Sequence, residues 1–261
     1  MPFQTAVGLR FFQFDLFKSS GVTQAIFTRQ GGVSQAQWTS LNVGATVGDD
    51  PENVRQNLER SFAALGRPRH SLFDSWLVHG THALVAEDPR PADQAKPPQA
   101  DILLTNKPDV TLFMRYADCT PILLVDPRRR AVALAHAGWR GTVQRAAARA
   151  VEAMQAQYGS QPGDLLAGIG PSISARHYQI GPEVVDEVQA AFGGQAADLL
   201  PQYNERTHFD LTAANQLILQ QAGVGQIEQA GLCTYADSQD WFSHRGSGGQ
   251  TGRFGALLAL A

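Results

Sequence analysis

A thiol and an imidazole stand at the outer ends of two short apolar runs in the middle of the chain. Cys119 precedes the run 122–125, and His136 follows the run 131–135, with the turn signal Asp126-Pro127 between the two runs. The pattern predicts a strand, a turn and a second strand. Because paired strands lie about 5 Å apart, we expect the thiol and the imidazole to meet, where they can hold a soft metal ion or form a nucleophilic pair.

His79 offers a third ligand, at the end of a predicted strand over 73–78. Two imidazoles and a thiolate are the ligand set of an open zinc site, which keeps its fourth position for water. The spacing alone leaves two alternatives. Cys119 is a small buried apolar residue beside hydrogen-bonded histidines, or it is a nucleophile with a histidine as base and Asp118 orienting that base. Two histidines rather than one favour the metal site.

Three arginines are candidate ligands for an anion. Arg140 comes just before a predicted helix, where its guanidinium would add to the free N–H groups of the first turn. Arg29 lies in a glycine-containing turn after a predicted strand. Arg245 lies in a glycine-rich loop that lacks the lysine and the spacing of a P-loop, so nucleoside triphosphate binding is not indicated.

The elements around these residues interleave strands and helices without a regular βαβ period. Such a pattern is typical of an α+β fold with mixed sheets, and we expect a single domain over residues 1–261. The predicted helices cover 51–65 with Asp50 as N-cap, 142–158, 182–192, and 211–222 with Asp210 as N-cap; the predicted strands cover 25–28, 73–78, 83–86, 100–105, 111–114, 165–169, 226–230 and 254–260; residues 88–100 form a proline-rich loop.

Charge and cysteine content favour a small-molecule protein of a reducing compartment. Lys and Arg number 21 against 24 Asp and Glu, and the resulting charge of −3 gives no broad surface for nucleic acid or for an anionic membrane. The N-terminal residues lack a signal-peptide pattern, and no apolar stretch approaches the roughly 20 residues of a membrane span. We therefore expect a cytoplasmic protein whose two cysteines, Cys119 and Cys233, are thiols.

Several sequence blocks together resemble the laccase-domain family, over a stretch that runs from about Gly21 to the C-terminus. Members of this family were first called polyphenol oxidases and are now regarded as purine nucleoside phosphorylases and adenosine deaminases, including the peptidoglycan editing factors. The blocks are the loop 29–34, Ser40-Leu41-Asn42, residues 47–51, Val78-His79-Gly80, Ala117-Asp118-Cys119, the HAGWRG block at 136–141, residues 170–173 and Thr251-Gly252-Arg253.

The resemblance implies a metal site and a substrate class. The family's His, Cys and His ligands correspond to His79, Cys119 and His136, and its fold is one domain of packed mixed sheets with outer helices. The implied activity is a zinc-dependent purine nucleoside phosphorylase with adenosine deaminase activity, acting on adenosine, inosine, guanosine or methylthioadenosine. The implied partners are the nucleoside and phosphate, with the protein a monomer or a weak homo-oligomer.

Substrate contacts follow as hypotheses. Arg140 is our candidate for phosphate, Arg29 and Asn42 for the base or ribose, and Arg245 for a further substrate contact. The chain departs from the family pattern at Leu77, where a glutamine is usual, at Ser172, where a cysteine is usual, and at Gly246-Ser247, where Arg-Asp is usual. The last departure bears on substrate contacts, and none of the three touches the expected metal ligands.

Two other enzyme classes would use the same residues. An amidase that edits mis-built peptidoglycan precursors fits the same three side chains. A polyphenol oxidase would need copper, which one thiol and two imidazoles can hold, but the several copper sites of a true laccase need more histidines than the seven present.

Overall fold

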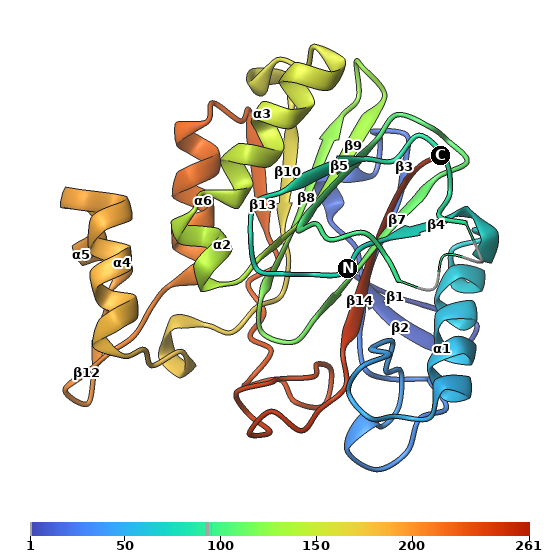
Figure 1. Cartoon of the computed structure of the whole chain (residues 1–261), viewed down its shortest axis with the longest axis horizontal. Coiled ribbons are helices and arrows are strands. Elements are labelled where there is room, and N and C mark those ends of the chain that lie inside the picture. The colour runs from blue at the N-terminus through green and yellow to red at the C-terminus, as the bar shows by residue number, and fades with distance from the viewer. Residues whose placement is uncertain (1, 92–93, 95) are drawn as a thin grey trace.

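Two six-stranded sheets pack face to face in the computed structural model, which describes residues 2–91, 94 and 96–261 (Figure 1). The strand order is β1-β2-β3-β14-β7-β4 in the first sheet and β13-β10-β8-β9-β6-β5 in the second. Parallel and antiparallel pairs occur in both sheets, since β4 runs parallel to β7 and β5 runs parallel to β6. The expected architecture of packed mixed sheets with outer helices is confirmed.

The first sheet is covered on its outer face by one helix, α1, Pro51–Ala64. Leu58 and Phe62 of this helix pack against Phe113 and Leu257 of the sheet. The strands of this sheet are β1 Phe3–Ala6, β2 Leu9–Phe12, β3 Val22–Phe27, β4 Leu72–Asp74, β7 Thr111–Tyr116 and β14 Phe254–Leu260.

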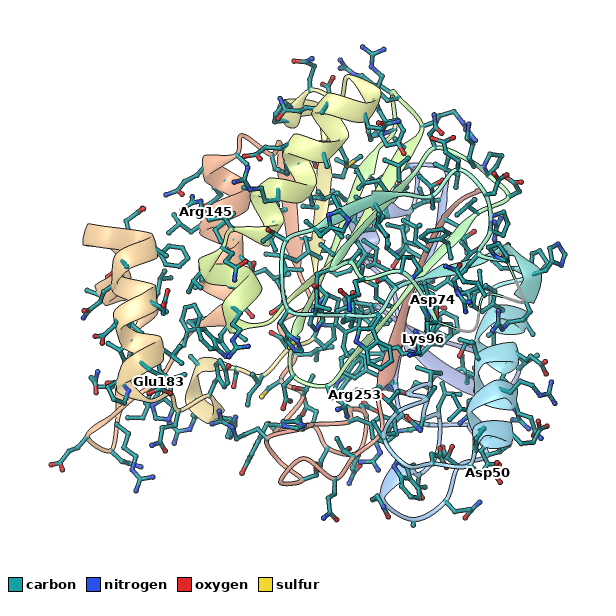
Figure 2. All side chains as sticks on the ribbon, viewed as in Figure 1. Asp50, Asp74, Lys96, Arg145, Glu183 and Arg253 are labelled. Carbon is teal, nitrogen blue, oxygen red and sulfur yellow. The ribbon has the colours of Figure 1, made fainter. Side chains whose placement is uncertain are left out.

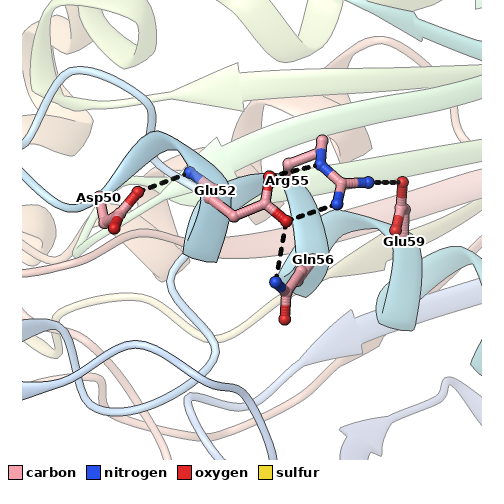
Figure 3. Close-up of polar contacts among 5 residues, drawn as sticks. All are labelled: Asp50, Glu52, Arg55, Gln56 and Glu59. Carbon is pink, nitrogen blue, oxygen red and sulfur yellow. Dashed lines mark hydrogen bonds and ion pairs between the residues drawn. The ribbon is translucent and has the colours of Figure 1, made fainter.

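The first turn of α1 has the cap that the sequence predicts. The Asp50 carboxylate accepts a hydrogen bond of 2.8 Å from the backbone N–H of Glu52, which satisfies one of the free N–H groups at the helix start (Figure 3). Farther along the exposed face, the Arg55 guanidinium pairs with both Glu52 and Glu59.

The outer face of the second sheet is covered by α2 Trp139–Val143, α3 Ala146–Tyr158 and α6 Leu211–Gln221 (Figure 1). Helices α4 Pro182–Phe192 and α5 Ala196–Leu199 lie farther out, against α2 and α6. The strands of this sheet are β5 Ala83–Val85, β6 Ile102–Thr105, β8 Thr120–Asp126, β9 Ala131–Ala137, β10 Leu166–Ile169 and β13 Gln226–Gln229. A small hairpin of β11 Gln202–Tyr203 and β12 Arg206–Thr207 follows α5. Among the described residues, none of the helices has the length and apolar character to cross a bilayer.

Short 3-10 turns connect these elements. They are η1 Asp15–Phe17, η2 Ala36–Trp38, η3 Arg69–Ser71, η4 Pro162–Asp164, η5 Ala175–His177 and η6 Gly193–Gln195.

The central strands β8 and β9 are buried on both faces. Leu123 and Val125 of β8 face the other sheet, whereas Ile122 and Leu124 face the helices. Successive side chains of a strand point to opposite faces, so a continuous apolar run suits a strand that is covered on both sides. The apolar runs that predicted these two strands are explained by this double burial.

Most predicted elements are confirmed, with three corrections. The predicted helix over 142–158 is confirmed as α3 from Ala146 to Tyr158, but its start is wrong, because α2 ends at Val143 and Arg145, with a left-handed φ of 64°, separates the two helices. The predicted strand over 73–78 is wrong beyond Asp74, where the chain leaves the sheet. Strands β1 and β2 were not predicted. Within the predicted loop over 88–100, residues 92, 93 and 95 lie outside the described residues.

Candidate metal centre

Three side chains from separate parts of the chain converge where the central strands β8 and β9 end. His79 comes from the loop after β4, Cys119 from the connection between β7 and β8, and His136 from β9. Their ligand atoms all lie within 4.8 Å of one another. Pro121 pairs with His136 across the β8–β9 hairpin, so Cys119 lies just beyond the paired strand end. The meeting of thiol and imidazole that the hairpin predicts is confirmed, and we call these three residues the triad.

A buried carboxylate, Asp101, orients one imidazole of the triad. The Asp101 Oδ1 atom lies 2.9 Å from Nδ1 of His136, and the backbone N–H of His136 donates to the carbonyl oxygen of Asp101 at 2.8 Å. Because Nδ1 is occupied, Nε2 is the ring nitrogen that remains as a metal ligand. A carboxylate behind a ligating histidine fixes the ring orientation and increases its basicity as a ligand.

The same carboxylate fixes the turn that carries His79. It accepts hydrogen bonds from the backbone N–H groups of Val78 at 3.1 Å, His79 at 3.0 Å and Gly80 at 2.8 Å. His79 has a left-handed φ of 60°, a conformation that residues other than glycine adopt only when the surroundings hold them. Asp101 therefore positions both histidines of the triad.

The sequence analysis missed Asp101. The signal was a charged residue directly before the apolar strand run, because a carboxylate that is buried at such a place needs hydrogen-bond partners.

The electrostatics of the site favour a thiolate at Cys119. Burial acts to raise the pKa of this thiol, but the neighbouring imidazoles of His136 and His79 outweigh it and lower the pKa to about 6. For His136, burial acts to lower the pKa, and the Cys119 sulfur and the Asp101 carboxylate raise it to about 9. A thiolate is the form in which cysteine binds metal.

Because Gly138 has no side chain, there is space beside it for the side chains of Cys119 and His79. A Cβ atom at this position would lie 2.8 Å from the Cys119 sulfur and 3.3 Å from Cδ2 of His79. Both separations are below ordinary van der Waals contact, so a side chain here would displace two of the three ligands.

A cavity of about 220 Å³ opens beside the triad. Arg245 lies on its wall, with its guanidinium carbon 5.0 Å from the ring centre of Tyr178 and a hydrogen bond of 2.8 Å to the carbonyl oxygen of Gln179. The lining residues are His79, Ala117, Asp118, Cys119, Gly138, Trp139, Ile173, Tyr178, Leu211, His244 and Arg245. The cavity joins apolar walls to two triad ligands and one guanidinium, an arrangement typical of small-molecule sites.

Three predicted substrate residues do not line this cavity. Arg29 donates to the carbonyl oxygens of Thr39 and Ser238, at 2.7 and 3.1 Å. Asn42 is fully buried, and its amide bonds to Asp49 and to the backbone of the chain around it. Arg140 is exposed over its neighbour Trp139, at 5.3 Å from the ring centre. Of the predicted substrate residues, the structure brings Arg245 to the cavity.

The position of Asp118 corrects the hypothesis that this residue orients a histidine. Its carboxylate accepts hydrogen bonds from the Thr234 hydroxyl at 2.6 Å and from the Arg245 backbone N–H at 2.7 Å. The backbone of Asp118 has a left-handed φ of 84°. Asp118 thus ties the loop of Cys119 to the C-terminal segment, and Asp101 is the carboxylate that contacts a triad histidine.

Comparison with known proteins gives consistent matches along the chain. The family model described as "Multi-copper polyphenol oxidoreductase laccase" matches residues 23–261. A Deinococcus radiodurans protein named purine nucleoside phosphorylase is 37% identical over 239 residues, which cover 92% of this chain and 89% of the relative. The Escherichia coli protein named purine nucleoside phosphorylase YfiH is 33% identical and covers 92% of this chain and 94% of its own length.

Solved structures share the whole fold. The crystal structure of the Bacillus licheniformis hypothetical protein YfiH has a TM-score of 0.92 and 30% identity, covering 100% of this chain and 99% of its own. The crystal structure of YlmD from Geobacillus stearothermophilus has a TM-score of 0.91 and 31% identity, with coverage of 99% and 98%.

Proposed function

The chain belongs to the laccase-like family described as multi-copper polyphenol oxidoreductase laccase, and from this premise we propose that it is a zinc-dependent purine nucleoside phosphorylase that also deaminates adenosine. The observation that carries the proposal is the convergence of His79, Cys119 and His136, two of which, His79 and Cys119, line the cavity. The names of the similar bacterial proteins support the choice of purine nucleosides and phosphate as substrates.

The chemistry of the triad fits zinc. One thiolate and two imidazoles make a three-ligand set, and a carboxylate behind His136 is the outer partner that zinc-binding histidines usually have. Copper also accepts these ligands, but among the described residues we find one group of this kind rather than the several of a multi-copper enzyme. When bound, zinc would supply a Lewis acid that polarises an oxygen atom in the cavity.

The residues of the chain have separate tasks in this proposal. Asp101 keeps Nδ1 of His136 occupied and holds the His79 turn, so both rings are positioned before a ligand arrives. Tyr178 presents an aromatic ring on the cavity wall, a surface on which a purine can stack. Ile173 and Leu211 add apolar area that excludes water from the reacting bond.

Arg245 is the proposed phosphate ligand. Among the described residues that line the cavity, Arg245 is the arginine. A planar guanidinium can donate two parallel N–H hydrogen bonds to phosphate oxygens. In phosphorolysis, phosphate attacks C1′ of the ribose while the bond from C1′ to the purine nitrogen breaks. Arg140, Arg29 and Asn42 do not line the cavity, so the proposal assigns them no direct contact.

Product analysis tests the proposal. Purified protein of known metal content is incubated with adenosine, with and without phosphate, and the products are separated by liquid chromatography. We expect adenine and ribose 1-phosphate only when phosphate is present, and inosine without it. The Cys119→Ala variant should form neither and should lose its metal, whereas Cys233→Ala, which changes the other cysteine, should match the unmodified protein in both respects. A zinc-replete protein that releases no purine product would refute the nucleoside activity.

A further inference from the structure

A second cavity, of about 570 Å³, lies between η5 and the β11–β12 hairpin. Of the described residues, none lines both this cavity and the one beside the triad. Gln179 stands between the two, because its side chain lines the second cavity while its carbonyl oxygen accepts the hydrogen bond from Arg245. The hairpin projects at the foot of α4, away from β14 (Figure 1). We call this space the hairpin cavity.

The lining of the hairpin cavity is rich in nitrogen and contains no carboxylate. Two guanidiniums, of Arg176 and Arg206, and two imidazoles, of His177 and His208, face it together with neutral amides and one tyrosine. The net charge of its wall is therefore positive.

Both guanidiniums lack an acidic partner within the part of the chain that the structure describes. Arg206 donates to the neutral Gln179 Oε1 at 3.0 Å, and the Arg176 guanidinium lies 5.7 Å from the ring centre of Tyr203. The acid in the hairpin turn, Glu205, is exposed and does not line the cavity. Glu183, labelled at the foot of α4 in Figure 2, folds against Gly181. No acidic side chain among the lining residues balances the positive charge of the cavity, so the cavity suits an anionic ligand.

The two imidazoles on the wall are held by contacts within the protein. His208 is 7% exposed, and its Nδ1 lies 2.9 Å from the carbonyl oxygen of Arg206. His177 Nδ1 lies 3.2 Å from the Ser174 hydroxyl and 3.4 Å from the Cys233 sulfur. A neutral imidazole that donates from Nδ1 keeps an acceptor at Nε2, so the two guanidiniums are the groups of the wall that can bind an anion.

The backbone around the cavity is firmly held. The Ile180 N–H donates to the carbonyl oxygen of Thr207, and the Phe209 N–H donates to that of Tyr178, both at 3.0 Å. The hairpin is therefore joined to the segment after η5 by backbone pairing on both sides of His208. A site on such a frame needs little reordering when a ligand binds.

From this arrangement we propose that the hairpin cavity is a second ligand site, which binds a small organic phosphate monoester. A monoester has three terminal oxygens and a charge near −2, which two guanidiniums match with parallel N–H bonds. The cavity opens to solvent, with Arg176 and Arg206 exposed, and its volume of about 570 Å³ leaves room for an organic group beside the phosphate. The Tyr203 ring is the apolar surface on which that group packs.

The test measures binding by calorimetry at physiological ionic strength. The probe is glucose 6-phosphate, which is neither substrate nor product of the proposed reaction, and the comparators are glucose and inorganic phosphate. The key variant is Arg176→Gln with Arg206→Gln. The matched control is the double variant Arg128→Gln with Arg149→Gln. It removes the same charge at two exposed arginines that do not line the cavity. Circular dichroism confirms that each variant is folded.

We expect glucose 6-phosphate to bind the unmodified protein and the control pair alike, and to bind the key variant at least about tenfold more weakly, because charge-assisted hydrogen bonds are lost. Glucose should not bind. Tyr203→Leu should weaken the binding of glucose 6-phosphate and leave the binding of inorganic phosphate unchanged. Equal binding to the key variant and to the control pair, or binding of glucose as tight as that of its phosphate, would overturn the proposal. These results do not depend on nucleoside turnover, so they stand apart from the test of the triad.

Discussion

At the scale of single residues, the proposed metal site depends on a side chain that is not one of the three candidate ligands. The Asp101 carboxylate contacts the His136 ring and accepts hydrogen bonds from three consecutive N–H groups around His79. Two ligands that are far apart in the sequence therefore share one anchor. A change at this anchor is expected to disturb both histidines at once.

Asp101→Asn tests this role. The amide has one acceptor oxygen in place of two. With that oxygen at the Oδ1 position the Val78 and Gly80 N–H groups lose their acceptor, and with it at the Oδ2 position the His136 ring and the His79 N–H lose theirs. We expect zinc affinity to fall by about 10–100-fold, as for other outer partners of ligating histidines. Competition with a chromogenic chelator measures the zinc affinity of each variant. Asp88→Asn, the same change at an exposed position, is the control, and equal affinities of the two variants would contradict the role.

Gly138→Ala tests whether the triad needs an empty space beside it. The added methyl would lie 2.8 Å from the Cys119 sulfur, so the sulfur or the backbone must move. We expect zinc affinity at least about tenfold lower, with the fold intact by circular dichroism. Gly163→Ala serves for comparison, because its Cβ would meet nothing within 4 Å. A Gly138→Ala protein with full zinc content would show that the ligands tolerate the methyl.

At the scale of elements, short sequence patterns predicted the hairpin well and the helix boundaries less well. Strands β8 and β9 are local, since two apolar runs and a turn signal lie next to each other in the sequence. The break between α2 and α3 was not predictable from periodicity, because the alanine-rich pattern continues through Arg145. The left-handed conformation of Arg145 depends on tertiary packing.

Helix α1 allows a test of capping apart from the site. Asp50→Ala removes the acceptor for the Glu52 N–H seen in Figure 3, and we expect the free energy of unfolding to fall by about 1 kcal/mol. Zinc affinity should not change, since α1 covers the outer face of the first sheet. Urea denaturation measures the loss. Asp50→Asn keeps a capping oxygen and should stay close to the unmodified protein; equal losses in both variants would mean that the cap is not the cause.

At the scale of the whole molecule, a buried ion-pair cluster joins the edge of the first sheet to a loop. Asp74 on β4 is almost fully buried and contacts Arg90 at 2.6 Å and Arg115 of β7 at 2.9 Å (Figure 2 labels Asp74). Burial acts to raise the pKa of Asp74, and the two guanidiniums outweigh it, so the pKa is lowered. Folding therefore favours the charged form of this carboxyl.

The lowered pKa of Asp74 predicts how stability changes with acid. Above the unfolded pKa of about 4 the stabilisation is fully present, and it is lost as the pH falls through the lower folded pKa. We expect the free energy of unfolding to decrease below about pH 4, measured by urea denaturation across the acid range. Asp74→Asn should be less stable at neutral pH and should lose less on acidification. An acid profile for Asp74→Asn parallel to that of the unmodified protein would exclude this carboxyl as the cause.

The order of the strands could not be read from the sequence. β14, the last strand, lies between β3 and β7, and its pairing joins residues from opposite ends of the chain. Local patterns carry no information about such distant partners. The triad was assembled from a resemblance together with the hairpin. Asp101 had a signal in the sequence, as a charged residue before an apolar run, but its partner His136 and the place of Tyr178 became known only from the folded chain.

The β8–β9 hairpin also bears on the order in which the candidate ligands assemble in a chain that is still folding. Hairpins close within about 1–10 μs, far sooner than pairings between distant segments. We therefore expect Cys119 and His136 to meet early, and His79 to join them later, when its turn is held by Asp101. A newly synthesised chain would first present a two-ligand site that releases metal readily, and the three-ligand centre would appear with the closed pair of sheets. Tightly retained metal would then mark those molecules that have finished folding.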